Sequence, residues 1–242
     1  MITDSKGKIN FDEGQILLVD KPLTWSSFAV VNKLRYPLRR FYNKKKFKVG
    51  HAGTLDPLAT GLLVICTGKM TKQITGFIQD EKGYEGVIKL GASTPSYDLE
   101  TEIDATFPID HITPELIEET RLKFLGEQLQ TPPIFSAKKI DGKRAYESAR
   151  AGVEVKMKQS LISINSLEMK LEGDEIHFKT ECTKGTYIRS LAYDFGKALN
   201  SGAHLTALRR TKSGAFDIKD SKTIEEWMEV IENQATLEKK EV

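Results

Sequence analysis

Asp56 is the residue of this 242-residue chain whose surroundings most favour chemistry. It lies in a run rich in glycine, GHAGTLDPLATG at residues 50–61, and Pro57 biases its backbone towards an extended conformation. Glycines on both sides allow unusual backbone dihedrals and the close approach of a ligand backbone. A carboxylate among cations stays ionised, and an ionised, positioned carboxylate can act as a covalent nucleophile. On spacing alone, the same residues also fit an Asp-Pro turn without chemistry.

Charged residues are segregated along the chain, although the formal net charge is only +2. Nine basic residues and no acidic ones lie from Lys21 to Leu55, whereas eight acidic residues and no Lys or Arg lie from Asp98 to Glu119. This segregation is typical of a protein with one face that meets a polyanion. A solvated surface with a chance cluster of cations is the alternative.

Other catalytic patterns are weaker. The two cysteines, Cys66 and Cys182, and the four scattered histidines show no zinc spacing, so we expect no metal site and no cofactor. A glycosidase needs a second carboxylate, yet Asp56 is the only acid within residues 21–79. A Cys182–His204 pair is conceivable as a thiol nucleophile. Cys66 is expected to be buried, as a thiol in a reducing compartment.

The elements that position Asp56 begin with a strand and a helix. Residues 15–20 predict a short buried strand, and Ser26 or Ser27 is placed to cap a helix that Pro37 ends. The basic stretch that follows, to residue 48, is then a loop or an irregular helix. The buried stripe of the helix is expected to hold Phe28, Val31 and Leu34.

The rest of the chain alternates strands and helices without an internal repeat. Strands are predicted at residues 62–68, 84–91, 160–171 and 175–183, and as a pair around 203–218. Helices are predicted at residues 71–80, from a Thr113 cap until Pro132-Pro133 ends it, at 187–199, and in an acidic segment near the C-terminus. The inward face of the helix at 187–199 is expected to hold Ile188, Leu191, Ala192, Phe195 and Leu199. Residues 134–152 predict a strand, an Asp-Gly turn and a short basic helix. This order is neither regular βαβ nor all-β, so the fold class is α+β with a mixed sheet.

The length suits one domain, or one domain with an inserted lobe. The N-terminal residues lack the apolar core of a signal peptide, and no run approaches 18 apolar residues. We therefore expect a cytoplasmic protein that is not bound to a membrane. We also expect a monomer.

Several motifs resemble those of one enzyme family, in the same order, over about residues 14–216. GHAGTLDPLATG resembles the catalytic motif of the TruB-type tRNA pseudouridine synthases. The other resembling motifs are DKP with Ser26-Ser27 near the N-terminus, KGY at 82–84 with Leu90-Gly91, PPIFSAKKIDGKRAYESARAG, CTKGTYIRSLAYDFG and GAHLTALRRTKSG. The resemblance implies the pseudouridine synthase fold, a mostly antiparallel sheet with flanking helices and an inserted lobe at about residues 132–152 that grips RNA.

The resemblance also implies an isomerase that converts uridine 55 in the tRNA T loop to pseudouridine by flipping the base. Asp56 would be the nucleophile, Arg189 would pair with it, and Tyr84 would stack on the uracil. The resemblance further implies substrate contacts by His51, Tyr187, Leu208 and Lys21. The partner implied is the T stem-loop of tRNA. A catalytically silent tRNA-binding protein with the same fold is the alternative.

Two departures from the family pattern stand out. Thr24 occupies a position where the family often has glycine, and the stretch from Arg35 to Lys48 is longer and more basic than the usual connector. We interpret this stretch as an added RNA-contacting element, with a disordered loop as the competing interpretation. The catalytic domain is expected to span residues 1–222, and residues 223–242 a short acidic tail without the PUA module that many relatives carry, including those guided by small RNAs.

Overall fold

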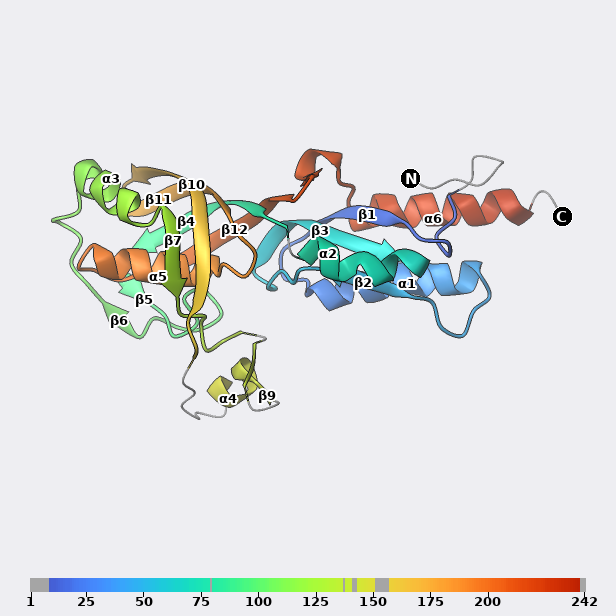
Figure 1. Cartoon of the computed structure of the whole chain (residues 1–242), viewed down its shortest axis with the longest axis horizontal. Coiled ribbons are helices and arrows are strands. Elements are labelled where there is room, and N and C mark those ends of the chain that lie inside the picture. The colour runs from blue at the N-terminus through green and yellow to red at the C-terminus, as the bar shows by residue number, and fades with distance from the viewer. Residues whose placement is uncertain (1–8, 79, 137, 141–142, 151–156, 240–242) are drawn as a thin grey trace. The chain divides into compact units, whose positions relative to one another are not determined.

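A computed structural model describes residues 9–78, 80–136, 138–140, 143–150 and 157–239 (Figure 1). The chain forms two compact units. The first comprises Met1–Lys82 and Arg209–Val242, and the second comprises Gly83–Leu208. Two strands, β4 (Lys82–Leu90) and β12 (Ala203–Ser213), contribute residues to both units. The combination of one large sheet and several helices confirms the predicted α+β class.

The sheet of the first unit has the strand order β1-β3-β12, where β1 is Ile16–Lys21 and β3 is Ala59–Thr67. Strand β2 (Val49–Ala52) pairs with β3, and β13 (Phe216–Asp217) pairs with β12. The pairs β1–β3, β2–β3 and β12–β13 are antiparallel. Strand β3 is buried along almost its whole length, as its continuous apolar run predicts. The first residue of β3, Ala59, follows the loop around Asp56 directly, so this loop is attached to a rigid strand.

Helix α1 (Ser27–Phe41) corrects two expectations. It continues through Pro37, although proline lacks an N–H and crowds the carbonyl four residues before it. Phe28 is 59% exposed, whereas the buried stripe holds Val30, Val31, Leu34 and Leu38. Leu34 and Leu38 are fully buried on either side of Pro37, so packing outweighs the local cost of the proline. Ser26 is the cap, with its hydroxyl accepting a bond from the amide of Ala29.

The acidic C-terminal segment forms helix α6 (Ile224–Lys239), which confirms the helix predicted there. Thr223 and Glu226 cap each other reciprocally, because each side chain accepts a hydrogen bond from the backbone amide of the other. Trp227 is buried, and its indole N–H donates to the carbonyl of Leu18 in β1. Helix α6 lies beside α1 (Figure 1). Its first turns therefore belong to the core of the first unit.

Three further short helices complete the first unit. They are η1 (Gly68–Gln73) and α2 (Ile74–Ile78), close to the predicted helix at 71–80, and η2 (Ile218–Asp220).

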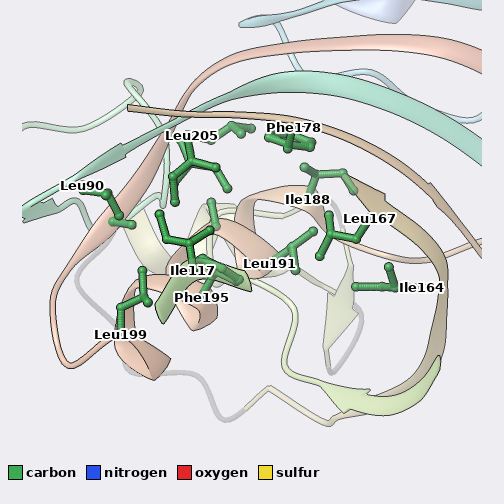
Figure 2. Close-up of a cluster of buried hydrophobic side chains, with 14 of the residues drawn as sticks. Leu90, Ile117, Ile164, Leu167, Phe178, Ile188, Leu191, Phe195, Leu199 and Leu205 are labelled. Atoms are coloured by element: carbon green, nitrogen blue, oxygen red, sulfur yellow. The ribbon is translucent and has the colours of Figure 1, made fainter. Parts of the chain in front are cut away.

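The sheet of the second unit has the strand order β12-β4-β11-β10-β7. Strands β10 (Ser160–Glu172) and β11 (Glu175–Cys182) pair antiparallel, and β7 (Gly126–Gln130) pairs antiparallel with β10. Helix α5 (Ile188–Ala198) supplies Leu191 and Phe195 to a buried cluster, in which the strands supply Ile164, Leu167 and Phe178 (Figure 2). All five residues predicted to face inward from α5 are buried.

Helix α3 is shorter than predicted. It runs over Pro114–Lys123 with Thr113 as its cap, and β7 follows where the helix was expected to continue. Gly126 has a φ of 86°, which a helix cannot contain, and this residue begins the strand. Two small hairpins, β5 (Ala92–Ser93) with β6 (Ala105–Thr106) and β8 (Lys139–Ile140) with β9 (Lys143–Arg144), are present in this unit.

The predicted insert at 132–152 contains β8, β9 and helix α4 (Ala145–Arg150), in agreement with the expected strand and short helix. The expected Asp-Gly turn at 141–142 lies outside the described residues. No helix in the described part of the chain has the length and hydropathy needed to cross a membrane.

Candidate active site

Asp56 lies half-buried in the loop between β2 and β3, and the backbone of this loop is fixed on both sides of it. The hydroxyl of Ser27 accepts a hydrogen bond from the amide of Leu55 at 2.8 Å and donates one to the Leu55 carbonyl at 3.0 Å. The carbonyl of Asp56 accepts from the amide of Ala59 at 3.1 Å, which closes a tight turn. The carboxylate is thus positioned by its own backbone while remaining partly open to solvent.

Lys21 lies beneath this loop, with a side chain that is fully buried. Its ammonium group donates to the carbonyls of Pro22 at 2.9 Å and Trp25 at 2.6 Å, and reaches the carbonyl of Pro57 at 3.4 Å. Burial lowers the pKa of Lys21 to about 8; the negative charge of Asp56 opposes the shift and the positive charge of Arg210 adds to it. Lys21 therefore joins the 21–25 loop to the Asp56 loop and places a cation in the electrostatic field of Asp56.

Arg210 is a second buried cation of this site, with 1% of its surface exposed. Its Nε donates to the carbonyl of Leu62 at 2.7 Å, and its two terminal nitrogens reach the carbonyls of Gly53 at 3.2 Å and Thr54 at 3.5 Å. A planar guanidinium can bind several carbonyls at once in fixed directions. Arg210 thus holds the N-terminal half of the Asp56 loop against β3.

The preceding residue, Arg209, forms a bidentate ion pair with Asp20 at 2.6 and 3.0 Å. Asp20 precedes Lys21, so this pair fixes the end of β1 where the 21–25 loop begins. Two consecutive residues of β12 therefore stabilise the two loops that surround Asp56.

Two glycines of the Asp56 motif have separate roles. Gly61 has a φ of 97°, and a Cβ there would lie 2.3 Å from the backbone oxygen of Arg210. We predicted that the glycines of this motif allow a ligand backbone to approach closely. At Gly61, the backbone that approaches is that of strand β12 in the same chain. Gly53 also has a positive φ, of 88°, but an added Cβ there would meet nothing closer than 3.5 Å. Gly53 is therefore required for its backbone conformation.

Thr24 has a φ of 69°, a left-handed conformation that is strained for a β-branched residue. Its amide donates to the carbonyl of Pro57 at 2.8 Å. The position where the family often has glycine thus keeps the backbone that glycine favours, and Thr24 connects this loop to the residue after Asp56.

His51 lies on β2, opposite Ile65 of β3, and is partly buried. Burial lowers the pKa of its imidazole, and the nearby Arg210 lowers it further. Its Nδ1 is buried and makes no hydrogen bond to any residue that the structure describes. A hydrogen bond with the Gly53 backbone opposes the lowering of the pKa, but the net direction is downward, which favours the neutral ring at physiological pH.

Arg189 belongs to the second unit, where it is 4% exposed on the first turn of α5. Its Nε lies 3.6 Å from Oδ2 of Asp98, which is also buried. Its terminal nitrogens donate to the carbonyls of Ser96 at 3.1 Å and Phe135 at 2.9 Å. Arg189 is thus held in one orientation by three groups from two different segments.

Tyr187 precedes α5, and Gln130 clamps its backbone. The side chain of Gln130 accepts from the amide of Tyr187 at 2.8 Å and donates to its carbonyl at 3.0 Å. The hydroxyl of Ser190 donates to the carbonyl of Thr131 at 2.8 Å. The start of α5 is therefore fixed to the segment that leads into the insert.

Tyr84 on β4 and Leu208 on β12 are partly buried and pack against the hydrophobic cluster of the second unit. Both side chains remain partly exposed, as residues that line a pocket must be.

Lys21, His51 and Asp56 therefore lie together in the first unit, while Tyr84, Tyr187, Arg189 and Leu208 belong to the second. The pairing of Asp56 with Arg189 stays a prediction. Sequence reasoning missed the structural roles of Ser27, Arg210 and Asp98. The consecutive arginines of the LRR segment and the single acid of the PSYD segment were the available signals.

The thiol alternative receives no support from burial. Neither cysteine forms a disulfide, both are fully buried, and burial raises the pKa of Cys66 to about 11. His204 is also buried, and its Nδ1 lies 3.0 Å from the carbonyl oxygen of Ala92. In the described part of the chain, no group of three or more His, Cys, Asp or Glu side chains is placed to hold a metal ion.

The sequence matches two family models. Residues 39–188 match the N-terminal domain of TruB family pseudouridylate synthases, and residues 189–241 match the C-terminal domain of tRNA pseudouridylate synthase B.

Curated relatives agree with these matches. The tRNA pseudouridine synthase B of Flavobacterium johnsoniae is 60% identical over 211 residues, covering 86% of this chain and 92% of that protein. The enzyme of the same name from Chlorobaculum tepidum is 40% identical over 239 residues, covering 98% of this chain and 99% of that protein.

Among solved structures, the crystal structure of the archaeal box H/ACA sRNP Nop10-Cbf5 complex aligns with a TM-score of 0.65 and 22% identity. The alignment covers 96% of this chain and 57% of that chain, and it supports the pseudouridine synthase fold. Taken with the two family matches, these likenesses show that the chain belongs to the TruB family of pseudouridylate synthases and is an isomerase that forms pseudouridine in tRNA.

Proposed function

We propose that this enzyme isomerises uridine 55 in the T loop of tRNA, with Asp56 as the nucleophile. The observation that carries the proposal is the setting of Asp56. It is half-buried, fixed through Leu55 and Pro57 on either side, and within the field of the buried cation Lys21. A carboxylate in such a setting remains ionised and need not reorganise when it attacks.

The reaction exchanges one bond for another within the nucleotide. Asp56 attacks either C6 of the uracil or C1′ of the ribose, and the bond between N1 and C1′ breaks. The detached ring rotates within the site, and C5 bonds to C1′. A proton then leaves C5 and N1 gains one, as Asp56 is released. The exchange is redox-neutral and transfers no phosphoryl group, so it calls for neither a cofactor nor a metal.

Arg189 would pair with the carboxylate of Asp56 during this reaction. A guanidinium beside the carboxylate favours its ionised form and fixes its direction. Arg189 is suited to this role because Asp98, Ser96 and Phe135 already hold it in one orientation. Tyr84, partly exposed at the surface of its hydrophobic cluster, would stack on the uracil and is the candidate acceptor of the C5 proton.

Extrusion of the base costs a few kcal/mol, which contacts elsewhere must offset. Stacking on an aromatic side chain contributes about 1–3 kcal/mol per base. Tyr187 and Leu208 would line the pocket beside Tyr84, and the neutral ring of His51 would occupy the space that the base leaves. The insert at 132–152 would hold the T loop, which is recognised largely by its shape.

The test compares the wild type with Asp56→Asn, using tRNA labelled with tritium at C5 of uridine. Because isomerisation releases the C5 hydrogen, the wild type should release tritium from position 55. The variant should lose about 10³-fold or more of the rate, since only the nucleophile is removed. Binding of tRNA should remain within a few-fold of the wild type, because Asn has the same shape.

A wild type that releases no tritium would instead indicate a tRNA-binding protein that has kept the fold. An Asp56→Asn variant with the wild-type rate would exclude Asp56 as the nucleophile. A substrate in which only uridine 55 is replaced by cytidine provides the control for position.

A further inference from the structure

A basic concavity lies at the C-terminal end of α1, outside the loop that holds Asp56. It encloses about 390 Å³ and belongs entirely to the first unit. We call it the basic turn surface, and it is lined by Tyr36, Arg39, Arg40, Asn43, Lys44 and Lys45.

The backbone beneath these side chains is an ordered turn rather than a loose loop. Asn43 has a φ of 47°, and its amide donates to the carbonyl of Arg40 at 3.2 Å. The amide of Lys44 donates to the carbonyl of Arg39 at 3.0 Å. These bonds satisfy the last carbonyls of α1, as a left-handed residue at a helix end commonly does. The cations are therefore presented by a defined backbone.

Tyr42 fixes this turn to the core of the unit. Its ring stacks on Phe47, with 5.1 Å between the ring centroids, and Phe47 is buried. Its hydroxyl accepts a hydrogen bond from the amide of Phe11 at 2.9 Å. A surface with little freedom to lose binds a ligand at a lower cost in conformational entropy.

The charges of the surface are mostly available to a ligand. Lys44 pairs with Asp12 at 2.7 Å, and both side chains are well exposed. Among the residues that the structure describes, Arg39, Arg40 and Lys45 have no acidic side chain within ion-pair distance. At least three positive charges thus face solvent in one concavity, where a polyanion would release counterions on binding.

One exposed aromatic ring lies among these cations, and a second lies nearer the start of α1. Tyr36 is 62% exposed, with the guanidinium of Arg40 at 5.9 Å from its ring centre. Phe28 is 59% exposed on the same helix, with Arg35 at 5.8 Å. Aromatic rings interleaved with arginine suit stacking as well as phosphate contacts, and both occur together at nucleic-acid surfaces. This combination favours RNA over an acidic peptide as the ligand.

Helix α1 also sets the distance from the catalytic loop. Its first residue, Ser27, binds Leu55 next to Asp56, whereas Arg39 and Arg40 lie in its last turn. A helix of 15 residues is about 20 Å long at 1.5 Å per residue. An RNA phosphate bound at this surface would therefore lie on the order of 20 Å from a nucleotide bound at Asp56.

We infer that the basic turn surface binds the sugar-phosphate backbone of the tRNA outside the T stem-loop. The inference rests on the proposed function, because it takes tRNA with its T loop at Asp56 as the substrate. The surface would supply affinity for the body of the tRNA and would take no part in the bond exchange.

The test measures the affinity of full-length tRNA and of the isolated T stem-loop for three proteins by fluorescence anisotropy over a range of salt concentrations. The proteins are the wild type, the triple variant Arg39→Gln, Arg40→Gln and Lys45→Gln, and a control that removes the same charge at Lys69, Lys72 and Lys219. The control residues are exposed in the same unit and lie outside the surface. Glutamine is a good helix former, so α1 should persist, and thermal unfolding verifies this.

The triple variant should bind full-length tRNA about tenfold or more weakly. The negative slope of log affinity against log salt concentration should become less steep by about 0.9 for each phosphate contact removed. Its affinity for the T stem-loop and its kcat on that hairpin should match the wild type. The control should resemble the wild type with both RNAs.

Unchanged affinity of the triple variant for full-length tRNA would overturn the inference, and so would an equal loss with both RNAs or the same loss in the control. A wild type that binds both RNAs but isomerises neither would count against the proposed function alone, because these comparisons measure only binding.

Discussion

The hydroxyl of Ser27 bonds to both backbone groups of Leu55, the residue that precedes Asp56. Both residues are buried, so no water can replace these two hydrogen bonds. The first residue of α1 therefore determines where the backbone of the loop that holds Asp56 lies.

Ser27→Ala should destabilise the protein by about 2–4 kcal/mol, because it leaves the buried N–H and C=O of Leu55 without partners. If Asp56 is the nucleophile proposed above, the kcat for isomerisation should fall by about 10–100-fold, since a small displacement of a reacting group is costly. Urea unfolding and single-turnover rates measure the two effects. The control is Ser26→Ala, which removes only the helix cap, costs about 1 kcal/mol and should leave kcat unchanged. Equal rates for both variants would contradict the role of Ser27.

Asp98→Asn tests the support of Arg189. The substitution keeps the shape but removes the negative charge 3.6 Å from the guanidinium, and so removes one buried ionic partner of Arg189. We expect a loss of about 2–4 kcal/mol in the free energy of unfolding, together with a lower kcat because Arg189 is less firmly oriented. Calorimetry and tritium release are the measurements. Glu102→Gln, at an exposed acid of the same connection, should change neither quantity.

The stability of the protein should depend on the titration of Lys21. Its pKa is about 8 in the folded chain and 10.5 when exposed, so the unfolded state binds more protons between these values. The free energy of unfolding of the wild type should therefore rise with pH in this window. The stability gained at high pH, where Lys21 is neutral in the folded chain, is lost as the pH falls through about 8. Lys21→Met lacks this titration. Urea unfolding should show that the free energy of unfolding of the wild type, minus that of Lys21→Met, increases from about pH 7 to about pH 10. A constant difference would show that Lys21 keeps its ordinary pKa.

Thr24→Gly should stabilise the protein by about 0.5–1 kcal/mol. A side chain in the left-handed conformation costs about 1–2 kcal/mol, and the greater freedom of glycine in the unfolded chain offsets part of the gain. Thr24→Ala removes the branching but retains Cβ, so it should recover less. Thermal unfolding of the wild type and the two variants ranks their stabilities. A Gly variant less stable than the wild type would mean that Thr24 is not strained.

Much of the fold was predictable because periodicity reports burial directly. The inward residues of α5 and the continuous apolar run of β3 were identified from the pattern of apolar residues alone. Helix α1 was predicted too short because Pro37 is a strong local signal, and the burial of Leu34 and Leu38 that outweighs it depends on distant segments. Strand β7 was missed because GEQLQ is a polar sequence whose pairing is supplied by β10.

The candidate site was predictable where residues carry recognisable chemistry in one short motif. Asp56 and His51 share such a motif, and Lys21 belongs to another. The roles of Ser27 and Arg210 depend on bonds to backbone carbonyls or amides that are remote in sequence. No pattern of residue types indicates such bonds, because every residue offers the same backbone groups.

The neighbouring positions of Arg209 and Arg210 restrict how strand β12 can change. Successive side chains of a strand point to opposite faces, so one arginine reaches Asp20 while the next reaches Gly53 and Leu62. A one-residue insertion or deletion that shifted this strand would exchange the two faces and separate both arginines from their partners at once. Substitutions are therefore tolerated along this strand more readily than changes in its length.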